Sequence, residues 1–330
     1  MTKWLIILIL LIIAAVAWQS QLSTSQDNQF KFTNPLTGTV TGDQVMAPGF
    51  ESGGQWINSE PLVLSDLVGP TANRDDVKAV LVDFWTYSCI NCQRTIPYLI
   101  SWWEKYQGLG LVIVGIHSPE FEFEKDLDNV IAATQKYAVT WPVVQDNNMT
   151  IWSAYKNRYW PRKYLINKEG VIVYDHIGEG AYEETERRIQ EVLGLSDMDV
   201  TKEPKTGGIG FGMMQTPELY ITTRGQVSGH LGSGMNQVNL TGDWQIGDDY
   251  SLANNNSSLS LSFKAGQMNL VMSVADNQSR TVTYSVDGQE QTIQVLADDL
   301  YSLWTGEFGN HTLNMKFEEG VRVHAFTFGQ

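Results

Sequence analysis

The 330-residue sequence predicts an α/β domain followed by an all-β antiparallel sandwich. From residue 45 to residue 195, apolar runs of strand length alternate with amphipathic helical patterns, as in a sheet that helices cover. From residue 217 to residue 330, short runs alternate apolar and polar side chains, which is typical of a sandwich. Residues 196–216 are rich in glycine and predict a linker between the two domains.

The N-terminus predicts export. Residues 1–18 hold Lys3 and then an apolar stretch that is shorter than the ~20 residues that span a bilayer comfortably. Ala15-Val-Ala17 fits a cleavage site, so these residues are a signal peptide or a retained membrane anchor. Residues 19–44 are polar and predict a tether. In either case we expect the rest of the chain to be extracytoplasmic, in the periplasm or on the outer face of the cytoplasmic membrane.

The elements of the α/β domain follow from apolar periodicity. The expected strands are residues 79–85, 110–117 and 141–145, followed by a hairpin of residues 162–167 and 170–175. The expected helices are residues 93–106, 124–137 and 181–193. In the second domain, the expected strands are residues 259–263, 268–272, 281–286, 291–295, 311–317 and 321–328. Asp287-Gly288 predicts a two-residue hairpin turn within this set.

The chain has two cysteines, Cys89 and Cys92, and they lie between the first of these strands and the first helix. A helix N-terminus offers unpaired N–H groups and the positive end of the helix dipole, which favour a thiolate. We therefore expect Cys89 to be the nucleophile and Cys92 the resolving thiol of a redox-active disulfide. A zinc half-site and a structural disulfide are the alternatives. Zinc needs four ligands, and a bridge across two residues constrains the unfolded chain little.

Charged residues near the dithiol are further candidates. Asp83 lies inside an apolar strand, where a buried carboxyl with a raised pKa can accept the proton of Cys92. His117 and Glu120 are either close enough to tune Cys89 or form a solvated pair at a strand end. The acidic run 120–126 predicts a solvated helix start. The net charge of −15, without a basic run, argues against nucleic acid as a partner.

The run Val82-Asp-Phe-Trp85, together with Cys89, Cys92 and Pro97, resembles the thioredoxin family. The resemblance implies that Asp83 is the buried proton-relay aspartate. It also implies that Pro161 is the cis-proline facing the dithiol and that the backbone of Trp160 pairs with substrate. The residues alone do not establish that the bond is cis.

The long insert before Pro161 resembles the TlpA/ResA/redoxin subgroup of the thioredoxin-like superfamily. Residues 84–92, 115–120 and 159–166 resemble the extracytoplasmic part of DipZ-type proteins, and residues 306–313 and 325–329 resemble their C-terminal sandwich, which is similar to carbohydrate-binding modules. Two features depart from the family: Ser88 replaces the usual Trp, and Ile90-Asn91 replaces the common Gly-Pro between the cysteines.

These observations predict an exported thiol–disulfide oxidoreductase, acting as a reductant, without metal or cofactor. Its expected partners are protein disulfides and, because no polytopic membrane domain is present in the sequence, a separate CcdA/DsbD-like membrane electron donor. A glycan on the sandwich is a further candidate, with Tyr220, Trp244, Tyr250 and Trp304 either stacking on sugar or filling the core. The alternative functions are a peroxidase using Cys89, suggested by Thr86-x-x-Cys89, and a glycan-binding or partner-binding module with a regulatory dithiol.

Overall fold

The computed structural model describes residues 45–195, 198–200, 215–276 and 278–329. Residues Gln44–Gln330 form one compact unit. The expected signal peptide or anchor (residues 1–18) and the expected tether (residues 19–44) lie outside the described residues, as does most of the linker 196–216. Within the described ranges, no helix is both long and apolar enough to cross a membrane.

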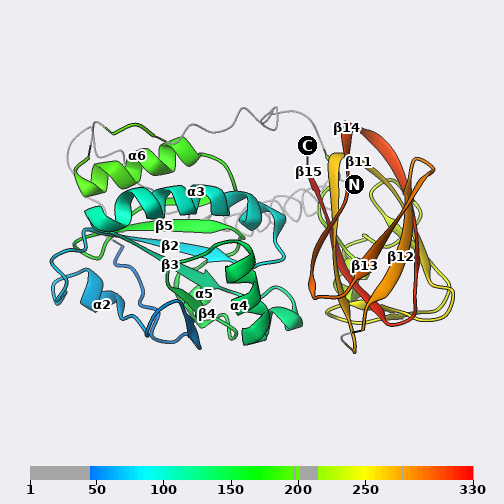
Figure 1. Ribbon diagram of the computed structural model, residues 1–330, viewed down its shortest axis with the longest axis horizontal. Helices are drawn as coiled ribbons and strands as arrows, with labels where there is room; N and C mark the ends of the chain where they lie inside the picture. Colours follow the sequence, from blue (N-terminus) through cyan, green and yellow to red (C-terminus); the bar gives the residue numbers. More distant parts are fainter. Residues whose placement is uncertain (1–44, 196–197, 201–214, 277, 330) are drawn as a thin grey trace, which may run out of the picture. The chain divides into compact units, whose positions relative to one another are not determined.

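The first part of the chain forms a mixed six-stranded sheet with the strand order β1-β4-β3-β2-β5-β6 (Figure 1). β2 runs parallel to β3 and β3 parallel to β4, whereas β1, β5 and β6 pair antiparallel with their neighbours. The strands are β1 (Trp56–Ile57), β2 (Ala79–Trp85), β3 (Leu111–His117), β4 (Val143–Gln145), β5 (Arg162–Asn167) and β6 (Ile172–Ile177).

Every residue of β2 is buried, and successive side chains of a strand point to opposite faces, so both faces of the sheet are covered. α3 and α6 lie along the same face (Figure 1), and their apolar residues share one cluster with Leu81 and Ile113. Phe84 meets the ring of Tyr155, just beyond α5, at 5.3 Å. The helices are α2 (Leu64–Leu67), α3 (Ile90–Tyr106), η1 (Gln107–Leu109), η2 (Glu122–Lys125), α4 (Leu127–Lys136), α5 (Thr150–Ala154) and α6 (Tyr182–Leu193).

The predicted helix over residues 124–137 is wrong at its start. A 3-10 turn, η2, occupies Glu122–Lys125, and α4 begins only at Leu127. The side chain of Asp126 caps α4 by accepting a hydrogen bond from the N–H of Asp128 at 2.8 Å. An N-cap residue has extended backbone angles, as Asp126 does with φ −68° and ψ 124°, so the helix cannot continue through it.

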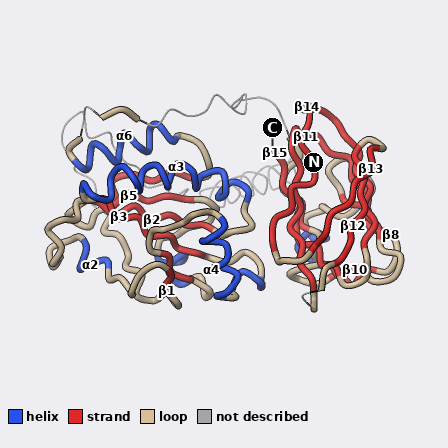
Figure 2. The backbone as a smooth tube through the Cα atoms, in the orientation of Figure 1, coloured by secondary structure: helices blue, strands red, loops and turns tan. Residues whose placement is uncertain are grey.

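The second part of the chain forms a nine-stranded antiparallel sheet that curls into a sandwich (Figure 2). The central path is β13-β12-β14-β11-β15-β10-β9, with β7 on β15 and β8 on β11. Its elements are β7 (Leu219–Tyr220), α7 (Thr223–Val227), β8 (Val238–Thr241), β9 (Trp244–Ile246), β10 (Ser251–Ala253), β11 (Ser258–Val274), β12 (Arg280–Val286), β13 (Gln289–Val295), β14 (Asp299–Phe317) and β15 (Val321–Gly329). Asp287 and Gly288 both have positive φ, 51° and 82°, which confirms the predicted hairpin turn.

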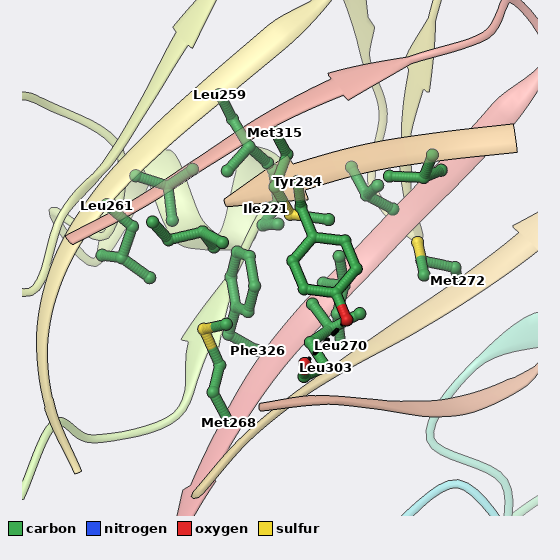
Figure 3. Packing of buried hydrophobic residues seen from close by; sticks show 14 of the residues in the cluster. Ile221, Leu259, Leu261, Met268, Leu270, Met272, Tyr284, Leu303, Met315 and Phe326 are labelled. Carbon is green, nitrogen blue, oxygen red and sulfur yellow. Dashed lines mark hydrogen bonds between the residues drawn. The ribbon is translucent and has the colours of Figure 1, made fainter. Parts of the chain in front are cut away.

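β11 is one long strand where the sequence predicts two. Its register against β14 shifts between Ala265 and Gln267, so the inward side chains change from odd to even numbers. Both halves therefore face one core, in which Figure 3 shows Leu261 and Met268 together. The hydroxyl of Tyr284 donates to the carbonyl of Leu303 at 2.8 Å in this core.

Candidate functional site

Cys89 is the N-cap residue of α3, in the loop that follows β2. Its backbone is extended, and its sulfur accepts a hydrogen bond from the N–H of Cys92 at 3.3 Å. A cap position normally holds an oxygen acceptor, and the helix dipole stabilises negative charge there. Cys89 is half-buried, so its sulfur sits at a helix N-terminus within reach of solvent.

Cys92 lies one turn into α3 and is 2% exposed. Both cysteines are free thiols in this structure. Burial and the hydrogen bond with Cys89 raise the pKa of the Cys92 thiol. The two sulfurs therefore differ in accessibility, with Cys89 the accessible one and Cys92 held as a protonated thiol beneath it.

The predicted relay residue Asp83 is buried in β2 at 3% exposure. Burial raises its pKa to about 7, and the charge of Lys163 opposes that rise. The negative charge of Asp83 in turn contributes to the raised pKa of Cys92, which places the two groups within electrostatic reach. A carboxyl that titrates near neutral pH beside a buried thiol is suited to take up its proton.

Lys163 is a site residue that the sequence analysis missed. It lies directly opposite Asp83 in the β2–β5 register and is fully buried. Burial lowers its pKa, while the charges of Asp83 and Cys92 oppose that effect. Neither Asp83 Oδ1 nor Lys163 Nζ has a hydrogen-bond partner among the described residues. The available signal was a lysine two positions after Pro161, on a strand that is expected to pair inside the sheet.

Of the two predicted substrate-binding residues, Trp160 packs near the dithiol. The Trp160–Pro161 peptide bond is cis, as the family resemblance implies. Trp160 and Cys89 both pack against the apolar cluster that contains Cys92. The indole N–H of Trp160 donates to the carbonyl of Ser118 at 2.9 Å, and its ring lies 4.3 Å from that of Trp152.

The acidic run is not a solvated helix start, because Glu124 is fully buried. Its carboxylate accepts a hydrogen bond from the hydroxyl of Ser88, the residue before Cys89, at 2.6 Å. His117 is not solvated either. It stacks on Tyr87 at 5.8 Å, and burial lowers its pKa to about 3, so the ring is neutral.

The four aromatic residues proposed for sugar stacking pack against separate neighbours. Tyr220 is buried at 8% exposure, and Tyr250 lies 5.8 Å from the ring of His324. Trp244 packs on Phe317 at 5.3 Å, and Trp304 packs on His311 at 4.3 Å. All four rings therefore have packing partners, which favours the core interpretation.

Comparison with known proteins gives matches for both parts of the chain. Residues 46–175 match the AhpC/TSA family, and residues 217–329 match the family described as Thioredoxin like C-terminal domain. Protein DipZ of Mycobacterium bovis is 30% identical over 315 residues, which cover 86% of this chain and 43% of that protein. Thiol-disulfide oxidoreductase YkuV of Bacillus subtilis is 27% identical, covering 43% of this chain and 90% of its own length. Thiol-disulfide oxidoreductase ResA of Halalkalibacterium halodurans is 29% identical, covering 40% and 72%.

The fold and these matches define a thioredoxin-fold protein of the TlpA/ResA type, with an appended antiparallel sandwich. Within that class the chain is related to DipZ, although it spans less than half of the DipZ protein that it matches. The relatives YkuV and ResA are both named thiol-disulfide oxidoreductases.

Proposed function

We propose that the protein is a thiol–disulfide oxidoreductase in which Cys89 attacks and Cys92 resolves. The observation that supports this is the asymmetry of the two thiols. Cys89 is half-buried and its sulfur caps α3, whereas Cys92 is buried with a raised pKa. An attacking thiol must reach its substrate, and a resolving thiol must wait for the mixed disulfide.

In the reductive direction, the thiolate of Cys89 attacks a substrate disulfide and one substrate thiolate leaves. Cys92 then loses its proton to the carboxylate of Asp83, and its sulfur attacks Cys89 in the mixed disulfide. The second substrate thiolate leaves, and the Cys89–Cys92 disulfide forms. Two electrons pass from the dithiol to the substrate, so a later donor must return them. Trp160 borders the same cluster, and Trp160 and the cis-linked Pro161 are the proposed substrate contacts.

Reduction outside the cytoplasm is the direction and location that we propose. The apolar segment of residues 4–18 supports export. An exported dithiol is oxidised by default, so it works as a reductant only when electrons are supplied to it. We propose protein disulfides as substrates and a CcdA/DsbD-like membrane protein as the donor.

Disulfide reduction of insulin with dithiothreitol as electron source tests the proposal. We expect wild-type protein to catalyse the reaction and both Cys89→Ser and Cys92→Ser to lose at least ~10²-fold in rate, because the chemistry needs both thiols. Equal activity of wild type and Cys92→Ser would rule out the two-thiol mechanism. A far-ultraviolet circular dichroism spectrum that matches wild type would show that each variant is folded and that its loss of rate is chemical.

A peroxidase is the second candidate, because residues 46–175 match the AhpC/TSA family. Thr86 stands three residues before Cys89, but its hydroxyl lies 3.5 Å from Nε2 of buried His117. Steady consumption of hydrogen peroxide by the Cys92→Ser variant would favour this function over disulfide exchange.

A neutral glycan is the ligand that we propose for the sandwich. A cavity of about 260 Å³ lies on β8, β11, β12, β13 and β14, far in sequence from the dithiol, and most of its lining residues carry hydroxyl or amide groups. The lining residues are Thr241, Ser258, Leu259, Ser260, Thr283, Tyr284, Ser285, Glu290, Asn314, Met315 and Lys316. Binding to a glycan array that Asn314→Ala abolishes would support this ligand, and no binding by wild type would refute it.

A further inference from the structure

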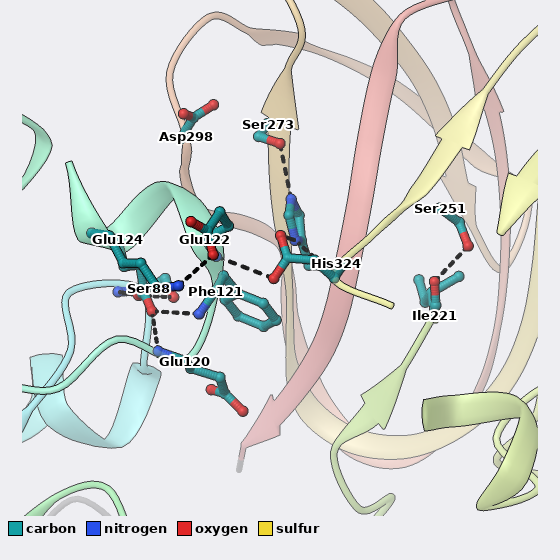
Figure 4. Close-up of polar contacts among 12 residues, drawn as sticks. Ser88, Glu120, Phe121, Glu122, Glu124, Ile221, Ser251, Ser273, Asp298 and His324 are labelled. Atoms are coloured by element: carbon teal, nitrogen blue, oxygen red, sulfur yellow. Dashed lines mark hydrogen bonds and ion pairs between the residues drawn. The ribbon is translucent and has the colours of Figure 1, made fainter. Parts of the chain in front are cut away.

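Glu124 connects the loop of the nucleophile to a distant segment. Its carboxylate is fully buried on η2. Oε1 accepts hydrogen bonds from the hydroxyl of Ser88 at 2.6 Å and from the N–H of Ser88 at 3.3 Å. Oε2 accepts from the N–H of Glu120 at 2.6 Å and from the N–H of Phe121 at 3.0 Å. Figure 4 shows the carboxylate among these three residues.

This set of donors favours the carboxylate form of Glu124. Three of the four contacts come from backbone N–H groups, which donate and cannot accept. Burial raises the pKa of Glu124, but the hydrogen bonds from Ser88, Thr86, Phe121 and Glu120 oppose that rise. At 2.6 Å, the contact with the Ser88 hydroxyl is at the short end of the range for a hydroxyl hydrogen bond.

The sandwich holds the same segment from its other side. The rings of Phe121 and Phe123 each lie 4.9 Å from the ring of His324 on β15. The N–H of Glu122 donates to a carboxylate oxygen of Asp249 at 3.1 Å, and the hydroxyl of Tyr220 donates to Glu120. Figure 4 shows His324 next to Phe121. One short segment, residues 120–125, thus contacts the loop before Cys89 and the sandwich together.

We propose that Glu124 is a positioning residue for the dithiol, and that the sandwich acts on the dithiol through residues 120–125. The inference rests on the proposed function and assigns a role to the second domain. Ser88 precedes the cap residue of α3, and the N–H of Cys89 donates to the carbonyl of Thr86 at 3.4 Å in the same loop. A fixed position of Ser88 holds the backbone of Cys89 in place. Its sulfur can then accept the hydrogen bond from the N–H of Cys92.

Glu124→Gln tests the first half, because the amide places an NH2 group against N–H donors. We expect the rate of Cys89 attack on 5,5′-dithiobis(2-nitrobenzoate) to fall roughly tenfold, the value of one charge-assisted hydrogen bond. We also expect the equilibrium with glutathione to shift toward the Cys89–Cys92 disulfide, because reduced Cys89 loses its support. Glu122→Gln is the matched control. It makes the same chemical change on the same turn, at a side chain that pairs with Lys125 in solvent, and should react as wild type does.

A double-mutant cycle with Ser88→Ala shows whether the two residues act as a unit. We expect Ser88→Ala to slow the reaction in the same direction and the double variant to react no more slowly than Glu124→Gln alone. Full additivity of the two effects would overturn the proposal. The proposal would also be overturned if a folded Glu124→Gln protein kept the wild-type rate and the wild-type equilibrium with glutathione. If Glu124→Gln does not fold, Ser88→Ala decides, since it removes a single hydroxyl.

Tyr220→Phe tests the second half, because it removes the hydroxyl that binds Glu120. We expect a smaller loss in the same rate, about threefold. Tyr301→Phe is the control, since that hydroxyl donates to Ala297 inside the sandwich at 2.6 Å. Equal rates for the two tyrosine variants would overturn the role of the sandwich. If wild type fails to reduce insulin, the proposed function is wrong. The rates of the variants relative to wild type with 5,5′-dithiobis(2-nitrobenzoate) still test the roles of Glu124 and the sandwich.

Discussion

At the scale of single residues, the proposed reactivity of the dithiol involves two buried titratable groups. Asp83 and Lys163 face each other across β2 and β5, and each is almost fully shielded from water. The low polarity disfavours both charged forms, which raises the pKa of Asp83 to about 7 and lowers that of Lys163. Asp83 therefore gains and loses its proton in the pH range where disulfide exchange takes place.

We expect the rate at which Cys92 resolves the mixed disulfide to rise with pH through about 7, because Asp83 accepts a proton only as the carboxylate. Asp83→Asn should abolish that inflection and slow resolution roughly 10²-fold. Lys163→Met removes the cation that opposes the rise in the pKa of Asp83, so its inflection should move above 7. Single-turnover insulin reduction between about pH 5 and pH 9 measures both effects. An inflection that stays in place in Lys163→Met would contradict the assignment.

At the scale of elements, local sequence predicted much of the fold. The bounds of β2 and β5 agree with the expected strands. A mostly apolar run marks β2, and a shorter apolar run, Tyr164-Leu-Ile166, marks β5. Asp83 was predicted from its position on β2, and Cys89 from its position between β2 and α3. Lys163 and Glu124 were not, because their partners are remote in sequence. Strand register places Lys163 opposite Asp83, and the donors of Ser88 lie 36 residues before Glu124.

The interruption between η2 and α4 has a local cause that a substitution can test. Asp126→Ala removes the acceptor for the N–H groups of Asp128 and Asn129 and should lower the free energy of unfolding by about 1 kcal/mol. Asp126→Asn should retain most of that stability, since asparagine caps as well. Urea unfolding followed by tryptophan fluorescence gives the values. Asp128→Ala is the control in the first turn, and a loss as large as that of Asp126→Ala would refute the capping role.

At the scale of the whole molecule, buried histidines and buried carboxyls change the free energy of unfolding in opposite directions as pH falls. Burial lowers the pKa of His117 and of His324 to about 3, so both rings are neutral in the folded protein. Burial raises the pKa of Asp83 to about 7 and that of Glu120 to about 8. Below about pH 6.5 the unfolded chain takes up protons on histidine that the folded chain refuses, which lowers stability. Above about pH 4 the unfolded chain releases the carboxyl protons that folded Asp83 and Glu120 still hold. Folding therefore takes up protons at these two groups, so their contribution to stability rises as pH falls toward about 4.

His324→Gln tests the contribution of the buried histidine to the pH dependence of stability. The ring of His324 bonds Ser273 and the carbonyl of Asp249, and an amide can serve both partners. Because the variant no longer has a buried imidazole that resists protonation, its stability should fall less in acid than that of wild type. The difference in unfolding free energy should grow in favour of the variant by about 1.4 kcal/mol per pH unit between about pH 6 and pH 4. Urea unfolding at three pH values measures it. A difference that does not change with pH would mean that His324 takes up a proton in the folded protein as readily as in the unfolded chain, so the packing of its ring against Phe121 and Phe123 would not exclude charge.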